Sequence, residues 1–283
     1  MTAACFLFLG TSLLLYLAAA LLFQGHFLRR KSAWEGWGRR LLQWGLGIHS
    51  IGLALHFLFS GLSPFSNLLS VISLLIIACL LAGLLLERYT RVRRLNLLLA
   101  PLAFFGLLYP LLMPVRLEGA ASVLLEYPWL GVHVVVILLG NVGFALAFST
   151  AVIYLVQARL LKRGRLNHYL PALDTAASAT YRFAGIGFAF FTVGLGMGII
   201  WMFGAPGEYL ASFDFKILLA VTSWALFALY LYLSGLQGRH GSRLKWLVIA
   251  GFLLAAANLL GVRHHFVETS AAAPMTSNSL SAR

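Results

Sequence analysis

Eight apolar runs, each close to the length of a membrane-spanning helix, account for most of this chain. A transmembrane helix needs about 20 consecutive, mostly apolar residues. The runs fall at residues 4–28, 41–62, 67–86, 95–113, 129–157, 183–203, 213–235 and 246–262. Hydrophobic residues make up 61% of the chain and charged residues only 10%, whereas about half of a soluble domain is apolar. The sequence therefore predicts an all-α, polytopic membrane bundle with eight transmembrane helices.

The formal net charge of +13 follows the expected membrane topology. If the N-terminus lies outside, the predicted inner loops hold 17 of the 21 lysines and arginines. The outer segments then keep only Arg116, Lys216, Arg263 and Arg283. The positive-inside rule expects this asymmetry of a chain with both termini outside, N-out and C-out. Because topology explains the charge, no nucleic-acid partner is expected, and the lipid bilayer is the expected surrounding.

The two ends of the chain differ in character. The first apolar run is expected to be an uncleaved helix, because its basic cluster follows the run, the reverse of a secretory signal peptide. Residues 267–283 are rich in Ser, Ala, Thr and Asn, which predicts a disordered tail. Residues 1–266 then form one transmembrane domain. Cys5 and Cys79 lie inside apolar runs without a C-x-x-C spacing, so thiol–disulfide chemistry is not expected.

Two histidines of the second run are candidates for a role inside the membrane. His49 and His56 are seven residues apart, so they share one helix face. Ionisable groups in a membrane are costly and usually face a bundle interior, which suits a ligand or a proton relay. The simpler alternative is a hydrogen bond from each ring to a neighbouring helix. Their spacing of about 10 Å along the axis prevents both from binding one metal ion directly.

A second set of candidates gathers at the predicted outer surface. His133 lies one turn inside the fifth helix, and His264 and His265 end the eighth. The outer loop between the sixth and seventh helices carries Trp201 and Asp214. Two neutral imidazoles on opposite sides of an aromatic platform suit axial ligation of a haem iron, with the flat macrocycle stacked on the rings. Adjacent residues of a helix point apart, so only one of His264 and His265 can face such a site.

Glycines mark one face of the sixth helix. Gly187, Gly194 and Gly198 lie near the same face. Small residues at this spacing allow another helix, or a flat ligand, to approach the backbone closely.

Several segments in the second half of the chain occur together in one known family. They are Trp129-Leu130-Gly131-Val132-His133 with Tyr154, Leu170-Pro171-Ala172-Leu173-Asp174 followed by Tyr181-Arg182, the run from Gly194 to Trp201, Asp214-Phe215-Lys216 with Trp224, and Gly238-Arg239-His240-Gly241. With these segments, residues 126–262 resemble cytochrome c assembly proteins of the CcsA, ResC and CcmC type. The resemblance is closest to the eight-helix HemX and YpjD subgroup.

The resemblance implies roles for the outer residues. In that family the outer loop is a tryptophan-rich segment that handles haem, flanked by two outward histidines that ligate it. Carried onto this chain, His133 is the first ligand of the iron and His264 or His265 the second. Trp201 and Asp214 then belong to the tryptophan-rich segment.

The chain departs from the family pattern in two places. The full segment reads W-G-x-x-W-x-W-D, whereas residues 203–209 read Phe-Gly-Ala-Pro-Gly-Glu-Tyr and contain no tryptophan. Members that bind haem within the membrane have histidines at the positions of Leu62 and Tyr232. The HemX and YpjD subgroup shares this loss, so a complete haem exporter and synthetase is not expected. His49 and His56 are the candidates for a replacement internal site.

The resulting hypothesis is a multi-pass protein of the bacterial inner membrane that binds or handles haem at its outer face. Expected partners are haem and other proteins of cytochrome c maturation or haem metabolism. Without a nucleophile–base pair, a P-loop or a metal-ligand cluster in the sequence, the chain is not expected to be an enzyme. Two alternatives stay open: a regulatory or scaffolding protein of haem metabolism without a bound cofactor, and a small-molecule permease, although no inverted repeat supports the latter.

Overall fold

The computed structural model describes residues 3–60, 65, 67–90, 92–113, 129–165, 169–204, 215–236 and 241–261. Within these ranges it contains α-helices and one short π-helix but no β-strand. The elements are α1 (Ala3–Arg29), α2 (Ser32–Ser60), α3 (Leu68–Tyr89), α4 (Asn96–Leu112), α6 (Trp129–Lys162), α7 (Leu173–Gly204), α8 (Phe215–Leu231), η2 (Tyr232–Leu236) and α9 (Ser242–Gly261). Seven of these described helices are long and apolar enough to cross a membrane, and α4 has 17 residues. The predicted all-α polytopic bundle is confirmed.

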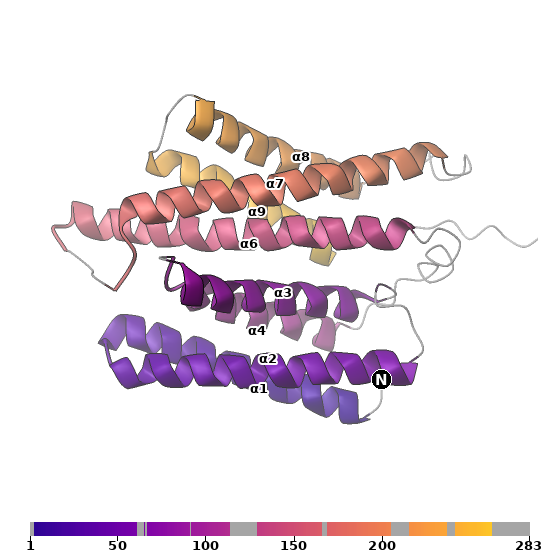
Figure 1. The fold of residues 1–283 in the computed structure, drawn as a ribbon, viewed down its shortest axis with the longest axis horizontal. Coiled ribbons are helices and arrows are strands. Elements are labelled where there is room, and N and C mark those ends of the chain that lie inside the picture. Colours follow the sequence, from indigo (N-terminus) through magenta and orange to yellow (C-terminus); the bar gives the residue numbers. More distant parts are fainter. Residues whose placement is uncertain are drawn as a thin grey trace, which may run out of the picture.

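The helices lie side by side in alternating directions (Figure 1). We call the end where α1, α3 and α6 finish the basic end, and the opposite end, where α6 begins, the His133 end. Every described lysine and arginine except Lys216 lies within about three turns of the basic end. This segregation has the form that the positive-inside rule requires, and the assignment of the basic end to the inner side stays a prediction.

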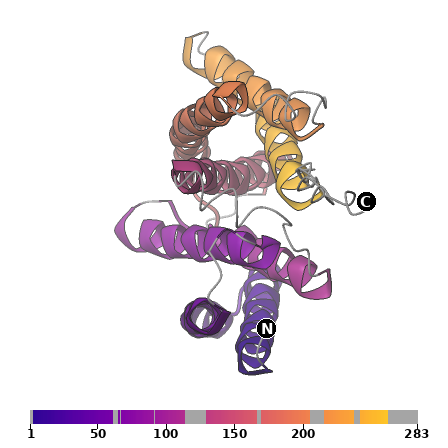
Figure 2. The ribbon, with the colours of Figure 1, turned by 90° about the vertical axis from the view of Figure 1, so that its right-hand side faces the viewer.

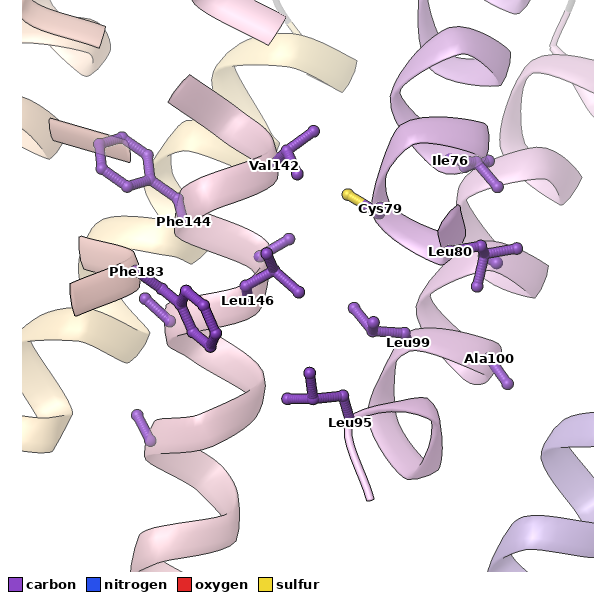
Figure 3. Packing of buried hydrophobic residues seen from close by; sticks show 14 of the residues in the cluster. Ile76, Cys79, Leu80, Leu95, Leu99, Ala100, Val142, Phe144, Leu146 and Phe183 are labelled. Atoms are coloured by element: carbon purple, nitrogen blue, oxygen red, sulfur yellow. The ribbon is translucent and has the colours of Figure 1, made fainter. Parts of the chain in front are cut away.

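The helices form three groups (Figure 2). One group is the pair α1 and α2, the next is the pair α3 and α4, and the last contains α6 to α9. The middle pair joins the other two, because α4 packs against α1 and α3 packs against α6. Figure 3 shows this junction, where Val142 and Leu146 of α6 face Cys79 of α3 and Leu95 and Leu99 of the α4 segment. Buried apolar side chains therefore hold the middle pair against α6.

The pair α6 and α7 is held with the two backbones in close contact. A Cβ atom at Gly143 would meet the backbone of Gly187, and a Cβ atom at Gly194 would lie 2.7 Å from the Ile137 side chain. Side chains larger than hydrogen at these positions would push the helices apart. The structure thus confirms the predicted packing face of α7 and identifies its partner as α6.

Two helices begin more than two turns before the apolar runs that predicted them. α7 begins at Leu173 and α2 at Ser32, whereas the runs start at residues 183 and 41. The added residues include Asp174 of α7 and Glu35 of α2, each in the first turn of its helix. An acidic group there interacts favourably with the positive end of the helix dipole. Hydropathy detects only the part of a helix that suits a bilayer, so these polar turns escaped it. Much of the chain between the predicted runs at residues 129–157 and 183–203 is therefore helical.

Candidate functional site

His133 is the most informative of the predicted site residues. It lies in the second turn of α6, and its ring packs against α7, where Nδ1 is 2.8 Å from the carbonyl oxygen of Gly194. A carbonyl oxygen only accepts hydrogen bonds, so Nδ1 carries the proton and donates it. In the neutral ring the lone pair is then on Nε2, and the one hydrogen bond that the described residues make to this ring is through Nδ1. His133 is thus an oriented imidazole with one nitrogen available for a ligand.

Glycine at position 198 makes this arrangement possible. A Cβ atom there would lie 2.9 Å from Cε1 of His133, well inside van der Waals contact. Gly194, which supplies the acceptor carbonyl, and Gly198 are one helical turn apart on the same face of α7. Trp201 follows Gly198 by three residues, which places it on that side of α7 toward the His133 end. The half-buried Trp201 and His133 are the two predicted site residues that the structure brings to one part of the bundle.

The other predicted residues of this site lie outside the described residues. They are Asp214, His264 and His265. α8 begins at Phe215, directly after Asp214, and α9 ends at Gly261, three residues before His264. Both of these helix ends belong to the His133 end of the bundle. Among the described residues no group of three His, Cys, Asp or Glu side chains could hold a metal ion.

His49 and His56 both have the partners that the simpler alternative predicted. His49 is fully buried, with Nδ1 3.1 Å from the Tyr16 hydroxyl of α1. The side-chain amide of Asn67 donates to Nε2 of His56 at 3.4 Å, while its oxygen accepts from the backbone N–H of Ser70 and caps α3. The second nitrogen of His49, Nε2, is buried and has no hydrogen-bond partner among the described residues. His49 therefore keeps an unused coordinating or proton-carrying atom inside the bundle.

A lysine that the sequence reasoning overlooked lies among tyrosines near the basic end. Lys245 of α9 is 1% exposed, and its Nζ donates to the Tyr230 hydroxyl at 2.9 Å. The same Nζ lies 5.1 Å from the ring centroids of Tyr154 and Tyr230. The sequence could have indicated this contact, because Lys245 lies one turn inside an apolar helix. A cation at such a position needs a hydrogen-bond acceptor or the face of an aromatic ring.

Trp224 and Tyr154, two of the residues that carry the family resemblance, have packing roles in the described structure. The indole N–H of Trp224 donates to the Thr192 hydroxyl at 2.9 Å, and its ring stacks on Phe188. Tyr154 of α6 offers its ring face to Lys245 of α9. These contacts tie α7 to α8 and α6 to α9, which fixes the four helices that carry the His133 end.

Fold and site together define a polytopic helical membrane protein with an oriented imidazole at one end of its C-terminal helices. The family described as Cytochrome C assembly protein matches residues 44–267. The chain belongs to this family.

Relatives agree with that membership. "Cytochrome c biogenesis protein CcsA" of Guillardia theta is 27% identical over 237 residues, which cover 75% of this chain and 77% of the relative. "Protein HemX" of Brevibacillus brevis is 30% identical over 164 residues, covering 56% of this chain and 60% of the relative. The expected resemblance to CcsA and to HemX is therefore confirmed.

A solved structure, "Cytochrome c Heme Lyase CcmF", shares the fold with a TM-score of 0.71 and 19% sequence identity. The match covers 94% of this chain but only 48% of that one, so this chain corresponds to about half of it. The neighbour's name contradicts the expectation that the chain is not an enzyme, and that prediction is wrong. It rested on the absence of a nucleophile–base pair or a P-loop, yet catalysis that works by holding two reactants in place requires neither.

Proposed function

We propose that this chain handles haem in cytochrome c assembly and holds it at the His133 end. The observation that supports this best is the geometry of His133. Metal-ligating histidines generally donate their second ring N–H to a carboxylate, a backbone carbonyl or water, which fixes tautomer and orientation. The bond from Nδ1 to the Gly194 carbonyl at 2.8 Å is such a contact, and it directs the lone pair to Nε2.

His133 and Trp201, the described members of this site, are residue types that suit a haem group. Haem iron accepts axial imidazole, and bound haem would supply that iron together with a flat aromatic surface. His133 would ligate the iron, and Trp201 would offer a surface on which the macrocycle stacks. Asp214 and either His264 or His265 remain proposed members of the same site, with His264 as the expected second ligand. The departure of residues 203–209 from the family's tryptophan pattern makes His133 the main determinant of binding.

In this proposal the chain acts by positioning. Holding haem and a second reactant in a fixed arrangement lowers a reaction barrier without an acid–base pair on the protein. Its haem-holding end would face the outer side of a bacterial inner membrane, with both termini outside. Haem is then its cargo or substrate, and other cytochrome c maturation proteins are its partners.

His49 supports a second candidate site inside the bundle. Its buried Nε2, with no described partner, could ligate haem or carry a proton between helices. His56 is less suited to this role, because its Nε2 already accepts from Asn67.

Haem titration of the purified protein in detergent tests the proposal. The absorption spectrum is recorded for the wild type, for His133→Ala, for His264→Ala with His265→Ala, and for His49→Gln. His26→Gln is the control, because His26 lies at the basic end, with Nδ1 2.6 Å from the Lys31 carbonyl. Loss of a saturable Soret band in the His133 variant, but not in the control, would support the site. Loss confined to His49→Gln would favour the internal site, and a wild type that binds no haem would favour the regulatory or permease alternatives.

A further inference from the structure

A cavity of about 280 Å³ opens at the basic end, far from His133. Its lining side chains come from α2, α3 and the segment that joins α3 to α4. We call it the arginine cleft, and it is lined by Glu35, Arg39, Glu87, Arg88, Arg93 and Arg94. A water molecule occupies about 30 Å³ in the liquid, so the cleft has room for a small polar group together with several waters.

Both carboxylates of the cleft are already neutralised. The carboxylate of Glu87 is 7% exposed, accepts from Nη2 of Arg39 at 3.1 Å and accepts from the backbone N–H of Asn96 at 3.1 Å. Glu35 pairs with Arg94 through one oxygen and lies 3.5 Å from Nε2 of His26 through the other. Neither carboxylate therefore has an unused charge to offer a ligand.

Two arginines of the cleft are left over. Arg88 and Arg93 are exposed, and neither has an ion pair among the described residues. Tyr169, which contacts Arg94, adds no negative charge, because a tyrosine hydroxyl is protonated near neutral pH and burial raises its pKa further, to about 12. The cleft consequently presents two positive charges that the chain itself does not balance.

The backbone beside Arg93 is held in an uncommon conformation. Arg94 has a φ of 73°, in the left-handed region that non-glycine residues seldom adopt. Its guanidinium lies 3.9 Å from the centroid of the Tyr169 ring, and its Nε donates to the Tyr169 carbonyl at 3.3 Å. These contacts, together with the ion pair to Glu35, offset the backbone strain and fix the segment that carries Arg93.

We infer that the arginine cleft binds a phosphate group, with Arg88 and Arg93 as its ligands. Guanidinium groups pair with phosphate through parallel N–H bonds, which an isolated lysine cannot reproduce. A lipid is the source that the surroundings favour, because basic pockets between membrane helices bind anionic headgroups. Leu85 and Leu81 are 46% and 47% exposed and lie three and seven residues before Arg88, which places them on the same face of α3. They form an apolar surface next to the headgroup site, along which the acyl chains of the lipid would lie.

The test is lipid binding by the purified full-length protein, measured by native mass spectrometry and by thermal unfolding. Three additives are compared, namely phosphatidylglycerol, zwitterionic phosphatidylcholine and inorganic phosphate. The test variant combines Arg88→Gln with Arg93→Gln. The control combines Arg163→Gln with Arg165→Gln, which removes two exposed arginines from the same end outside the cleft. A further variant, Arg88→Lys with Arg93→Lys, retains the charge and removes the planar fork.

The wild type and the control are expected to bind phosphatidylglycerol saturably and in preference to phosphatidylcholine. The Gln variant should bind it about tenfold or more weakly, because two charge-assisted hydrogen-bonding groups are lost. The Lys variant should fall between the two. Equal affinity for inorganic phosphate would uphold the phosphate site and overturn its assignment to a lipid. Equal losses in the Gln variant and the control, or no saturable binding by the wild type, would overturn the inference. This site stands independently of the haem proposal.

Discussion

The substitution Gly198→Ala tests whether haem binding depends on the orientation of the His133 ring, because it disturbs that orientation and leaves the histidine in place. The new Cβ atom would lie 2.9 Å from Cε1 of the ring, whereas carbon atoms pack at about 3.5–4.0 Å. The ring must therefore retreat from α7 by about 0.5–1 Å. A retreat of that size lengthens the 2.8 Å bond between Nδ1 and the Gly194 carbonyl to about 3.3–3.8 Å, which weakens or breaks it. The carbonyl keeps its helical bond from the residue 198 N–H, so folding is little affected.

Loss of this bond is expected to weaken haem binding by about tenfold, which corresponds to about 1.4 kcal/mol. Removing a hydrogen bond that orients a metal-binding side chain typically lowers the affinity for the metal by about 10–100-fold. Gly196→Ala is the matched control, because a Cβ atom at Gly196 meets nothing within 4 Å and the change in helix propensity is the same. The assay is spectroscopic haem titration of both variants in detergent. Equal haem affinity in the two variants would refute the claim that the contact with α7 prepares His133 for a ligand.

Two further predictions concern stability. Gly187→Ala should lower the unfolding temperature, because its Cβ atom would lie 2.9 Å from the Gly140 carbonyl oxygen. Gly185→Ala is the control and should leave the unfolding temperature unchanged, because its Cβ atom has its nearest neighbour at 3.9 Å. Thermal unfolding in detergent is the measurement, and equal unfolding temperatures of the two variants would contradict the prediction. Tyr230→Phe should cost about 1–3 kcal/mol, because it leaves the buried Lys245 ammonium without its acceptor, and adding Lys245→Met should recover part of this loss. A double-mutant cycle by denaturation measures that coupling, and additive losses would contradict it.

The sequence predicted the fold well because bilayer length and helix period are local properties. The apolar runs located all eight described α-helices, and the glycine spacing predicted the packing face of α7. The polar first turns of α2 and α7 escaped, since hydropathy reports only the membrane-compatible part of a helix.

The candidate site was only partly predictable. His133 was found from its place near a helix start, but its acceptor, the carbonyl of Gly194, lies 61 residues away in sequence. The same holds for the Tyr16 partner of His49 and for the pairing of Arg39 with Glu87 in the arginine cleft. Such contacts depend on how helices are rotated and placed against each other, and hydrophobic periodicity does not specify this.

The most direct measurement of haem ligation by His133 is chemical rescue. His133→Gly removes the imidazole and leaves room for a free one beside Gly198. Haem retained by the protein after gel filtration is then quantified by its Soret band, with and without imidazole in the buffer. Loss of retained haem in the variant, with recovery on addition of imidazole, is the predicted result. A variant that retains haem as the wild type does, with the same spectrum, would contradict ligation by His133.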